Sequence, residues 1–261
     1  DGIRDVERSR GLGDVYKRQE FVSFPEKRLP MPLEYDVIFD RLSHDITYLM
    51  ESLKAFSLNG GYVINNPFTS YATNKIVECI LCNKLGIRYP KTFILPKGEN
   101  RWDTGKSIGK PRWDSIKNDI GFPCIVKPFD GYAWENVFTV NSLDELKGIY
   151  RRFRNKTVLL VQELIRYTNY YRVFCVDKRD ILCAKWIPKP LGAGEYMEAE
   201  EDVISRYIDV IGRQSVHLNK VLDLDINALE WCITPEGEPV LIEAFNDVPD
   251  FPKGMMPERH Y

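Results

Sequence analysis

Residues 124 to 128 read Cys-Ile-Val-Lys-Pro, and this stretch decides the fold more than any other part of the chain. It follows a Gly-Phe-Pro turn and places Lys127 at the end of a short apolar run. Such a run, bounded by glycine and proline, is typical of a buried strand. A lysine there costs free energy unless an anion or an acidic side chain partners it. The stretch therefore predicts a buried strand that carries a cation toward an anionic partner.

Acidic residues interrupt two apolar runs nearer the C-terminus. Glu230 lies in the run 228–233 and Glu243 in the run 240–245, and the Thr-Pro-Glu-Gly-Glu segment between them predicts a hairpin turn. Two acids on neighbouring antiparallel strands, followed by Asn246, offer the hard oxygen ligands that Mg²⁺ prefers. Edge-strand charges that face solvent would give the same pattern, so this pairing alone leaves both interpretations open.

Cations of the right type accompany these acids. Arg172 and Lys185 lie in two apolar runs, 171–176 and 181–187, around an Asp-Lys-Arg-Asp turn that is typical of a hairpin. Lysine and arginine bind phosphate through charge-assisted hydrogen bonds. Together with Lys127, these residues predict a site for phosphate groups and a divalent cation.

The remaining pattern predicts alternating strands and helices, which is typical of an α/β protein. Residues 97–119 and 188–200 are rich in polar residues, glycine and proline, and we expect them to form loops. The expected helices cover 46–56, a segment capped by Ser70 or Thr73 and stopped by Gly86, 143–153 and 201 to about 218. The expected strands cover 35–39, 62–64, 93–95, 124–127, 137–140, 158–162, 171–176, 181–187, 226–233 and 239–245.

In their order along the chain, these features resemble the ATP-grasp superfamily over roughly residues 60 to 250. They are a lysine that opens a helix, the Ile-Val-Lys-Pro strand, a phosphate loop at 130–136, a Val-Gln-Glu-Leu-Ile hinge at 161–165, an arginine-bearing hairpin and a final pair of acidic strands. The pattern is similar to the glutathione-synthetase and ribosomal-protein glutamate-ligase branch. It implies an α/β (α+β) ATP-grasp fold, with two α+β subdomains clasping ATP after a truncated small α/β domain.

The resemblance also implies a role for each matching residue. The lysines would contact the ATP phosphates, the hinge would hold adenine, and the acids would bind two Mg²⁺ ions. The implied residues are Lys75, Lys127, Gln162, Glu163, Leu164 and Ile165 for ATP, Arg172 and Lys185 for catalysis, and Glu230, Glu243 and Asn246 for metal.

Three departures from the relatives' pattern bear on this site. The loop 130–136 holds one glycine where relatives often have three or four, so fewer backbone N–H groups can approach a phosphate. Asn74 stands where relatives usually have aspartate before the lysine. Asn246 follows Glu243 by three residues rather than the usual two, which reverses its side of a regular strand unless a bulge intervenes.

The N-terminal residues read differently from the rest of the chain. Residues 9–19, SRGLGDVYKRQ, back-translate to a sequence that resembles the transposase adapter used in sequencing libraries. We therefore interpret residues 1–19 as a cloning or assembly scar, and we expect the native gene to begin upstream. Residues 20–69 are expected to be the remnant of the small domain, 70–157 the N-terminal ATP-grasp subdomain and 158–261 the C-terminal subdomain.

Composition narrows the partners and the compartment. The 36 basic and 38 acidic side chains give no indication of binding to nucleic acid or to an acidic membrane. No apolar stretch approaches the roughly 20 residues that a membrane span needs. Six cysteines in mostly apolar runs, without a secretion signal before them, indicate reduced thiols and a cytoplasmic protein.

The resemblance implies an ATP-dependent ligase that joins a carboxylate to an amine or thiol through an acyl phosphate and releases ADP and phosphate. The expected partners are a small-molecule or peptide carboxylate and an amine substrate, and a homo-oligomer is compatible with the sequence. Three alternatives stay open: kinase-type transfer to a small molecule, a catalytically degenerate nucleotide-binding module, which the glycine-poor loop favours, and an interaction protein without a nucleotide.

Overall fold

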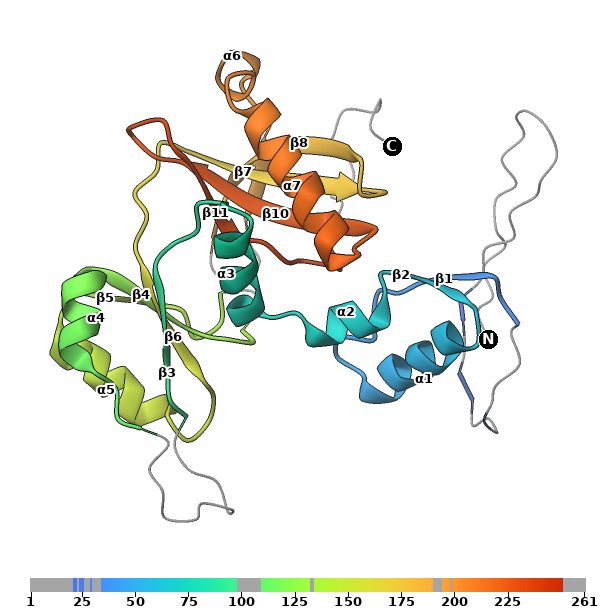
Figure 1. The fold of residues 1–261 in the computed structure, drawn as a ribbon, viewed down its shortest axis with the longest axis horizontal. Helices are drawn as coiled ribbons and strands as arrows, with labels where there is room; N and C mark the ends of the chain where they lie inside the picture. The colour runs from blue at the N-terminus through green and yellow to red at the C-terminus, as the bar shows by residue number, and fades with distance from the viewer. Residues whose placement is uncertain are drawn as a thin grey trace.

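Three sheets and their flanking helices make up the part of the chain that the computed structural model describes, which is residues 21, 22, 24, 25, 29, 34–97, 109–131, 134–189, 194–197 and 199–250 (Figure 1). None of the helices in these ranges has the length and apolar character needed to cross a membrane. The helices are α1 (Thr47–Leu58), α2 (Pro67–Ala72), α3 (Lys75–Lys84), α4 (Trp113–Asp119), α5 (Leu143–Phe153), α6 (Glu201–Ile204) and α7 (Ile208–Leu222). The strands are β1 (Val37–Phe39), β2 (Tyr62–Ile64), β3 (Thr92–Leu95), β4 (Cys124–Pro128), β5 (Phe138–Val140), β6 (Leu159–Glu163), β7 (Asn169–Val176), β8 (Asp180–Ile187), β9 (Glu195–Met197), β10 (Ile226–Ile233) and β11 (Pro239–Glu243).

The first unit is a parallel pair of strands, β1 and β2, connected through α1. Its core consists of Ile38, Leu53, Phe56 and Val63, which are all buried. Gly61 ends the connection from α1 to β2 where there is no room for a side chain, because a Cβ atom there would lie 2.2 Å from the Phe56 ring. The unit falls within the segment where the sequence predicts a small-domain remnant.

The second sheet is antiparallel and has the strand order β3-β6-β4-β5. Apolar residues of α4 and α5, among them Ile116 and Leu146, pack with its strands into one core. A capping box begins α5, since the backbone N–H of Glu145 donates to Ser142 Oγ (3.3 Å) and Glu145 Oε2 accepts from the N–H of Asn141 (2.8 Å). Strand β4 is paired on both sides, with β6 and β5, and Val126 is buried beside Lys127.

The third sheet is also antiparallel, with the order β11-β10-β7-β8-β9, and α7 packs on one face of it (Figure 1). Side chains alternate between the two faces because strand residues have a period of two. The residues that pack with α7 include Tyr171, Val173, Leu229, Trp231 and Leu241. The opposite face, which we call the front face, carries Tyr170, Arg172, Phe174, Ala184, Trp186, Ala228, Glu230 and Cys232.

Side-chain hydrogen bonds fix the N-terminal unit to the third sheet. Asn65 is only 5% exposed and donates to the carbonyl oxygens of Ile226 (2.7 Å) and Asp247 (2.8 Å), and it accepts from the N–H of Ile226 (2.8 Å). Tyr62 donates to a carboxylate oxygen of Asp225 at 2.7 Å. Asn65 thus satisfies backbone groups at the start of β10 and beyond the end of β11.

Most of the expected elements are confirmed, and four regions differ. Residues 67–72 form the separate helix α2, and the next helix, α3, is capped by Asn74 rather than by Ser70 or Thr73. The helix expected over 201–218 is two helices, α6 and α7, because residues 205–207 form a turn that does not interrupt the apolar spacing. The loop expected over 97–119 ends in α4, whose single buried residue, Ile116, gives too weak a periodic signal. The loop expected over 188–200 contains the short edge strand β9, which pairs only with β8.

We expect Asn65→Ala to lower the free energy of unfolding by about 2 to 3 kcal/mol, because it leaves buried backbone groups of Ile226 without partners. Urea unfolding followed by tryptophan fluorescence measures this change. The control is Asn155→Ala, since Asn155 is exposed in the turn after α5. Equal small effects of the two substitutions would contradict the structural role of Asn65.

Candidate functional site

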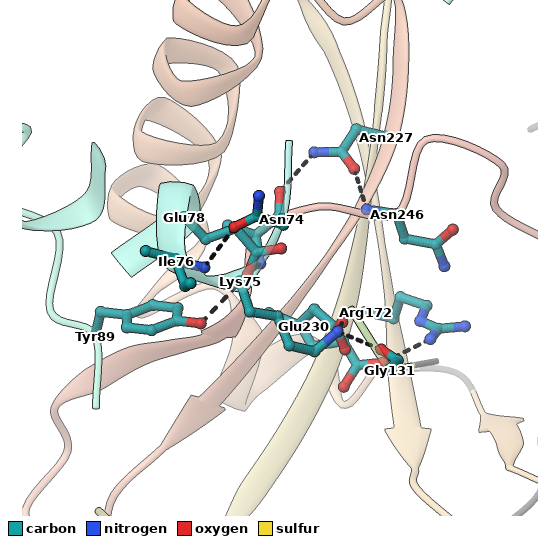
Figure 2. A network of polar contacts seen from close by, with 12 residues as sticks. Asn74, Lys75, Ile76, Glu78, Tyr89, Gly131, Arg172, Asn227, Glu230 and Asn246 are labelled. Carbon is teal, nitrogen blue, oxygen red and sulfur yellow. Dashed lines mark hydrogen bonds and ion pairs between the residues drawn. The ribbon is translucent and has the colours of Figure 1, made fainter. Parts of the chain in front are cut away.

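Lys75 begins α3 and connects the two larger sheets (Figure 2). Its Nζ lies 2.9 Å from Oε1 of Glu243 on β11 and donates to the carbonyl oxygen of Gly131, 2.6 Å away in the loop after β4. Burial lowers the pKa of Lys75, but Glu243 and Glu78 raise it overall, so the lysine stays charged. Asn74 is the N-cap of α3 and accepts from two N–H groups of its first turn, so asparagine performs the capping here.

Glu230 lies directly opposite Glu243 across β10 and β11. Both of its carboxylate oxygens are engaged, because Oε2 accepts from Tyr170 Oη (2.7 Å) and Oε1 from Arg172 Nη2 (2.6 Å). Burial lowers the pKa of Arg172, but Glu230 and Tyr196 raise it overall. The fold therefore brings the two predicted acids together and places a charged arginine beside one and a charged lysine beside the other.

Aromatic residues hold Arg172 on the front face. Its guanidinium carbon lies 4.4 Å from the Trp186 ring centroid, and its Nη1 donates to Tyr196 Oη at 2.6 Å. The rings of Trp186 and Tyr196 are themselves 4.4 Å apart. The sequence prediction omitted Tyr170 and Tyr196. Tyr170 could have been found, since it lies two residues before Arg172 on the same strand, whereas Tyr196 lies in a segment expected to be a loop.

Lys127 is almost fully buried at 8% exposure and makes no hydrogen bond or ion pair with any residue that the structure describes. Burial lowers its pKa, and this effect is only partly opposed by the negative charge of Glu243. A buried lysine without a direct partner is unfavourable. The structure confirms that Lys127 is buried on β4, and an anionic partner for it stays a prediction.

Glu78 is a buried acid that the sequence prediction missed. It is 1% exposed on α3 and accepts from Tyr89 Oη (3.2 Å) and from the N–H of Ala244 (3.2 Å), the residue after Glu243. Burial and the negative charge of Glu243 raise its pKa to about 7, although Lys75 acts in the other direction. Position 78 alone resembles an exposed helix residue, because the groups that bury it come from distant segments.

The predicted hinge links β6 to β7. Gln162 is buried and donates to Thr92 Oγ1 (3.0 Å), and Glu163 accepts from Arg88 at 3.1 Å with both oxygens. Leu164 is 37% exposed, whereas Ile165 packs against the cluster of Tyr170, Trp186, Cys232 and Val240. The side chains of Gln162 and Glu163 are therefore hydrogen-bonded to other residues of the protein, and Ile165 contributes an apolar surface next to the front face.

Lys185 lies away from the other predicted site residues. The register of β7 and β8 pairs it with Tyr171, which packs on the α7 side, while Ala184 lies opposite Arg172. Its Nζ forms an ion pair with Glu200. The expectation that Lys185 faces the ligand with Arg172 is corrected here, since a shift of one residue along a strand reverses the face.

Asn246 follows the end of β11. The N–H of Ala228 donates to its carbonyl oxygen at 3.0 Å, and Ala228 belongs to the front face. The preceding Ala244 and Phe245 instead belong to the core that the third sheet shares with α7 and α3. Residues that oppose each other on antiparallel strands share a face, so Asn246 lies on the same face as Glu230.

Within the described residues, no group of three or more His, Cys, Asp or Glu side chains forms a metal site by itself. The donors at the front face are instead two carboxylates, Glu230 and Glu243, with the amide of Asn246 nearby. Proteins commonly bind Mg²⁺ through one or two carboxylates together with the phosphates of a substrate. The donor set therefore fits Mg²⁺ that is bound jointly with a phosphate-bearing ligand.

No protein-family model matches the chain, and no curated protein sequence matches it. Solved structures, however, resemble it over most of its length. The ATP-grasp ligase PsnB complexed with a minimal precursor has a TM-score of 0.60 at 16% identity, over 84% of this chain and 72% of PsnB. D-alanine–D-alanine ligase from Bacillus anthracis complexed with ATP has a TM-score of 0.61 at 16% identity, over 85% of this chain and 71% of the ligase.

The macrocyclase MdnC from Microcystis aeruginosa MRC, bound with its precursor peptide MdnA, has a TM-score of 0.54 at 18% identity, over 84% of this chain and 72% of MdnC. A further structure of PsnB contains a minimal precursor, Mg and ADP. The likeness defines the fold: the chain has the mixed α/β fold of the ATP-grasp ligases over about four fifths of its length.

Titration of Glu78 predicts a dependence of stability on pH. The pKa is raised from 4.5 to about 7 by folding, so between these values the folded state keeps a proton that the unfolded state loses. The stability of the wild type should therefore fall as the pH rises through this window. Glu78→Gln removes the titrating group and keeps an oxygen acceptor.

We expect the variant and the wild type to unfold at similar urea concentrations at pH 5, and the variant to be the more stable at pH 8. Both proteins are measured without Mg²⁺ or nucleotide. A variant that is less stable by the same amount at both pH values would show that Glu78 is ionised throughout.

Proposed function

We propose that the chain is an ATP- and Mg²⁺-dependent ligase that joins a carboxylate to an amine or thiol through an acyl phosphate. The observation that carries this proposal is the convergence of Lys75, Lys127, Arg172, Glu230 and Glu243 between the second and third sheets. The solved structures of this fold that are named above include ligases in complex with ATP or with Mg and ADP.

Each charged residue has a part in this proposal. Glu230, Glu243 and Asn246 would hold Mg²⁺, which supplies positive charge to the phosphate oxygens when it is bound. Lys127 and Lys75 would contact the ATP phosphates. Lys75 would then leave its ion pair with Glu243 and form one with a phosphate instead. Because both residues are buried, their charges act in a medium of low dielectric constant, where they stabilise an anion strongly.

Arg172 has the position suited to the group that is transferred. It lies beside Glu230 on the front face, and the aromatic rings restrict its side chain to a narrow range of orientations. A guanidinium placed in advance near developing phosphoryl charge lowers the barrier without a cost of reorganisation. No side-chain nucleophile is needed, because the carboxylate substrate attacks the phosphoryl group and the amine then displaces phosphate.

We propose a small-molecule or peptide carboxylate as the substrate class. PsnB and MdnC, which share the fold, are bound to a minimal precursor and to a precursor peptide in their structures. Those contacts belong to those proteins, and for this chain the peptide is the candidate to test first.

We expect Lys127→Ala and Glu243→Gln each to lower the affinity for Mg·ATP at least about ten-fold, because each removes a charge that the ligand or its Mg²⁺ would contact. Isothermal titration calorimetry measures the affinity. The matched control is Lys185→Ala, which removes a lysine from the other face and should change the affinity by less than about two-fold. Unchanged binding in both site variants would show that the site is assigned wrongly.

Hydroxylamine tests the ligase chemistry. We expect ADP release to depend on an added carboxylate, and hydroxylamine to trap the acyl phosphate as a hydroxamate, which mass spectrometry detects. Arg172→Met should lower this turnover about 100-fold or more while Mg·ATP still binds, since the arginine acts on the transferred group. ADP release with a phosphorylated alcohol and no hydroxamate would identify a kinase instead.

A further inference from the structure

The final hairpin of β10 and β11 contains two extra residues relative to a regular ladder, one before Glu243 and one after it. In the final hairpin, Trp231 lies opposite Leu241, and Glu230 lies opposite Glu243, so one residue is bulged between these pairs. Two residues before Glu230, the N–H of Ala228 donates to Asn246 rather than to Phe245, which a regular continuation would place there. A second residue is therefore inserted between Glu243 and Asn246.

This second bulge decides where Asn246 points. Ala244 and Phe245 both belong to the core that the third sheet shares with α7 and α3, whereas neighbouring residues of a regular strand point to opposite faces. Because Asn246 lies opposite Ala228, which belongs to the front face, the extra residue returns Asn246 to that face. The three-residue spacing from Glu243 to Asn246 thus has the same outcome as a two-residue spacing without a bulge.

The side chain of Asn227 replaces the backbone hydrogen bonds that the bulge interrupts (Figure 2). Its Nδ2 donates to the carbonyl oxygen of Ala244 (2.9 Å), and its Oδ1 accepts from the N–H of Asn246 (2.8 Å). Asn219 on α7 fixes the orientation of this amide, because its Oδ1 accepts from the same Nδ2 at 3.0 Å. Asn227 and Asn219 are both fully buried.

Glu78 holds the same segment from the other side, through its hydrogen bond from the N–H of Ala244. The N–H and C=O groups of Ala244 and Asn246 are therefore all bonded, and side chains accept or donate in three of these four bonds. An apolar residue at position 227 could not make the contacts with both Ala244 and Asn246, so the bulge would lose its support.

We propose that Asn227 is a positioning residue that stabilises the bulge and thereby directs Asn246 to the metal site beside Glu230 and Glu243. The inference rests on the proposed function, because it assumes that this site binds Mg²⁺ with ATP. It assigns Asn227 a purpose beyond core packing: it makes the unusual spacing of the last ligand compatible with the site.

The test compares Asn227→Leu in two backgrounds, the natural chain and a chain from which Ala244 is deleted. Deletion places Asn246 two residues after Glu243, so a regular ladder carries it to the front face without help from Asn227. The readout is the Mg²⁺ midpoint, defined as the free Mg²⁺ concentration at which the affinity for ATP, measured by calorimetry, is half-maximal.

We expect Asn227→Leu to raise the Mg²⁺ midpoint about 10- to 100-fold in the natural chain, as is typical when support for a metal ligand is lost. Asn246→Ala should raise it to a similar extent. In the chain without Ala244, the midpoint should stay near the wild-type value with or without Asn227→Leu. Thermal unfolding identifies the folded variants, and Asn227→Val, whose smaller side chain has no hydrogen-bonding group, replaces Asn227→Leu where the latter fails to fold.

An equal rise of the midpoint in both backgrounds would overturn the proposal, since Asn227 would then act through general stability. No rise in either background would also overturn it. Failure of the wild type to bind ATP in any Mg²⁺ concentration is a separate result, because it rejects the proposed function itself and the inference with it.

Discussion

Two carboxylates, Glu230 and Glu243, face each other across neighbouring strands, and a cationic side chain lies against each of them. Like charges in directly opposed positions destabilise a sheet. Arg172 offsets one charge from within the same sheet, whereas Lys75 offsets the other from the start of α3. Lys75 also donates to the carbonyl oxygen of Gly131 in the loop after β4, so the ammonium group that offsets Glu243 in the third sheet is at the same time bonded to a loop of the second sheet.

The balance of charges in the site favours an anionic ligand. Three cations, Lys75, Lys127 and Arg172, stand against Glu230 and Glu243. The remaining acid, Glu78, is held at a pKa of about 7 by its burial, so near neutral pH it contributes only part of a negative charge. Of the three cations, Lys127 is the one without a direct partner among the described residues, although it lies at the end of a buried strand. Under the proposed function, a phosphate group of ATP would be the partner of Lys127 at this point.

The sequence allows the strands of Lys127, Glu230 and Glu243 to be predicted, because a charged residue inside an apolar run is rare and has few explanations. It does not determine which face of a hairpin strand a residue takes when the residues on both sides are similarly apolar, so Lys185 is placed wrongly by pattern alone. Nor does it reveal tertiary burial. Glu78 looks exposed until segments far along the chain cover it, and the bulged backbone before Asn246 is bonded to side chains of another strand and of α3, which no local pattern indicates.

The stacking of Arg172 on Trp186 has a consequence for spectroscopy. A guanidinium over an indole interacts with the same π electrons that absorb and emit light, so the emission of Trp186 depends on where the arginine lies. Arg172 is also bonded to Glu230, and any ligand that draws the arginine away changes the surroundings of the indole. Trp186 is one of five tryptophans in the chain, so we expect a ligand that displaces Arg172 to change one part of the total emission.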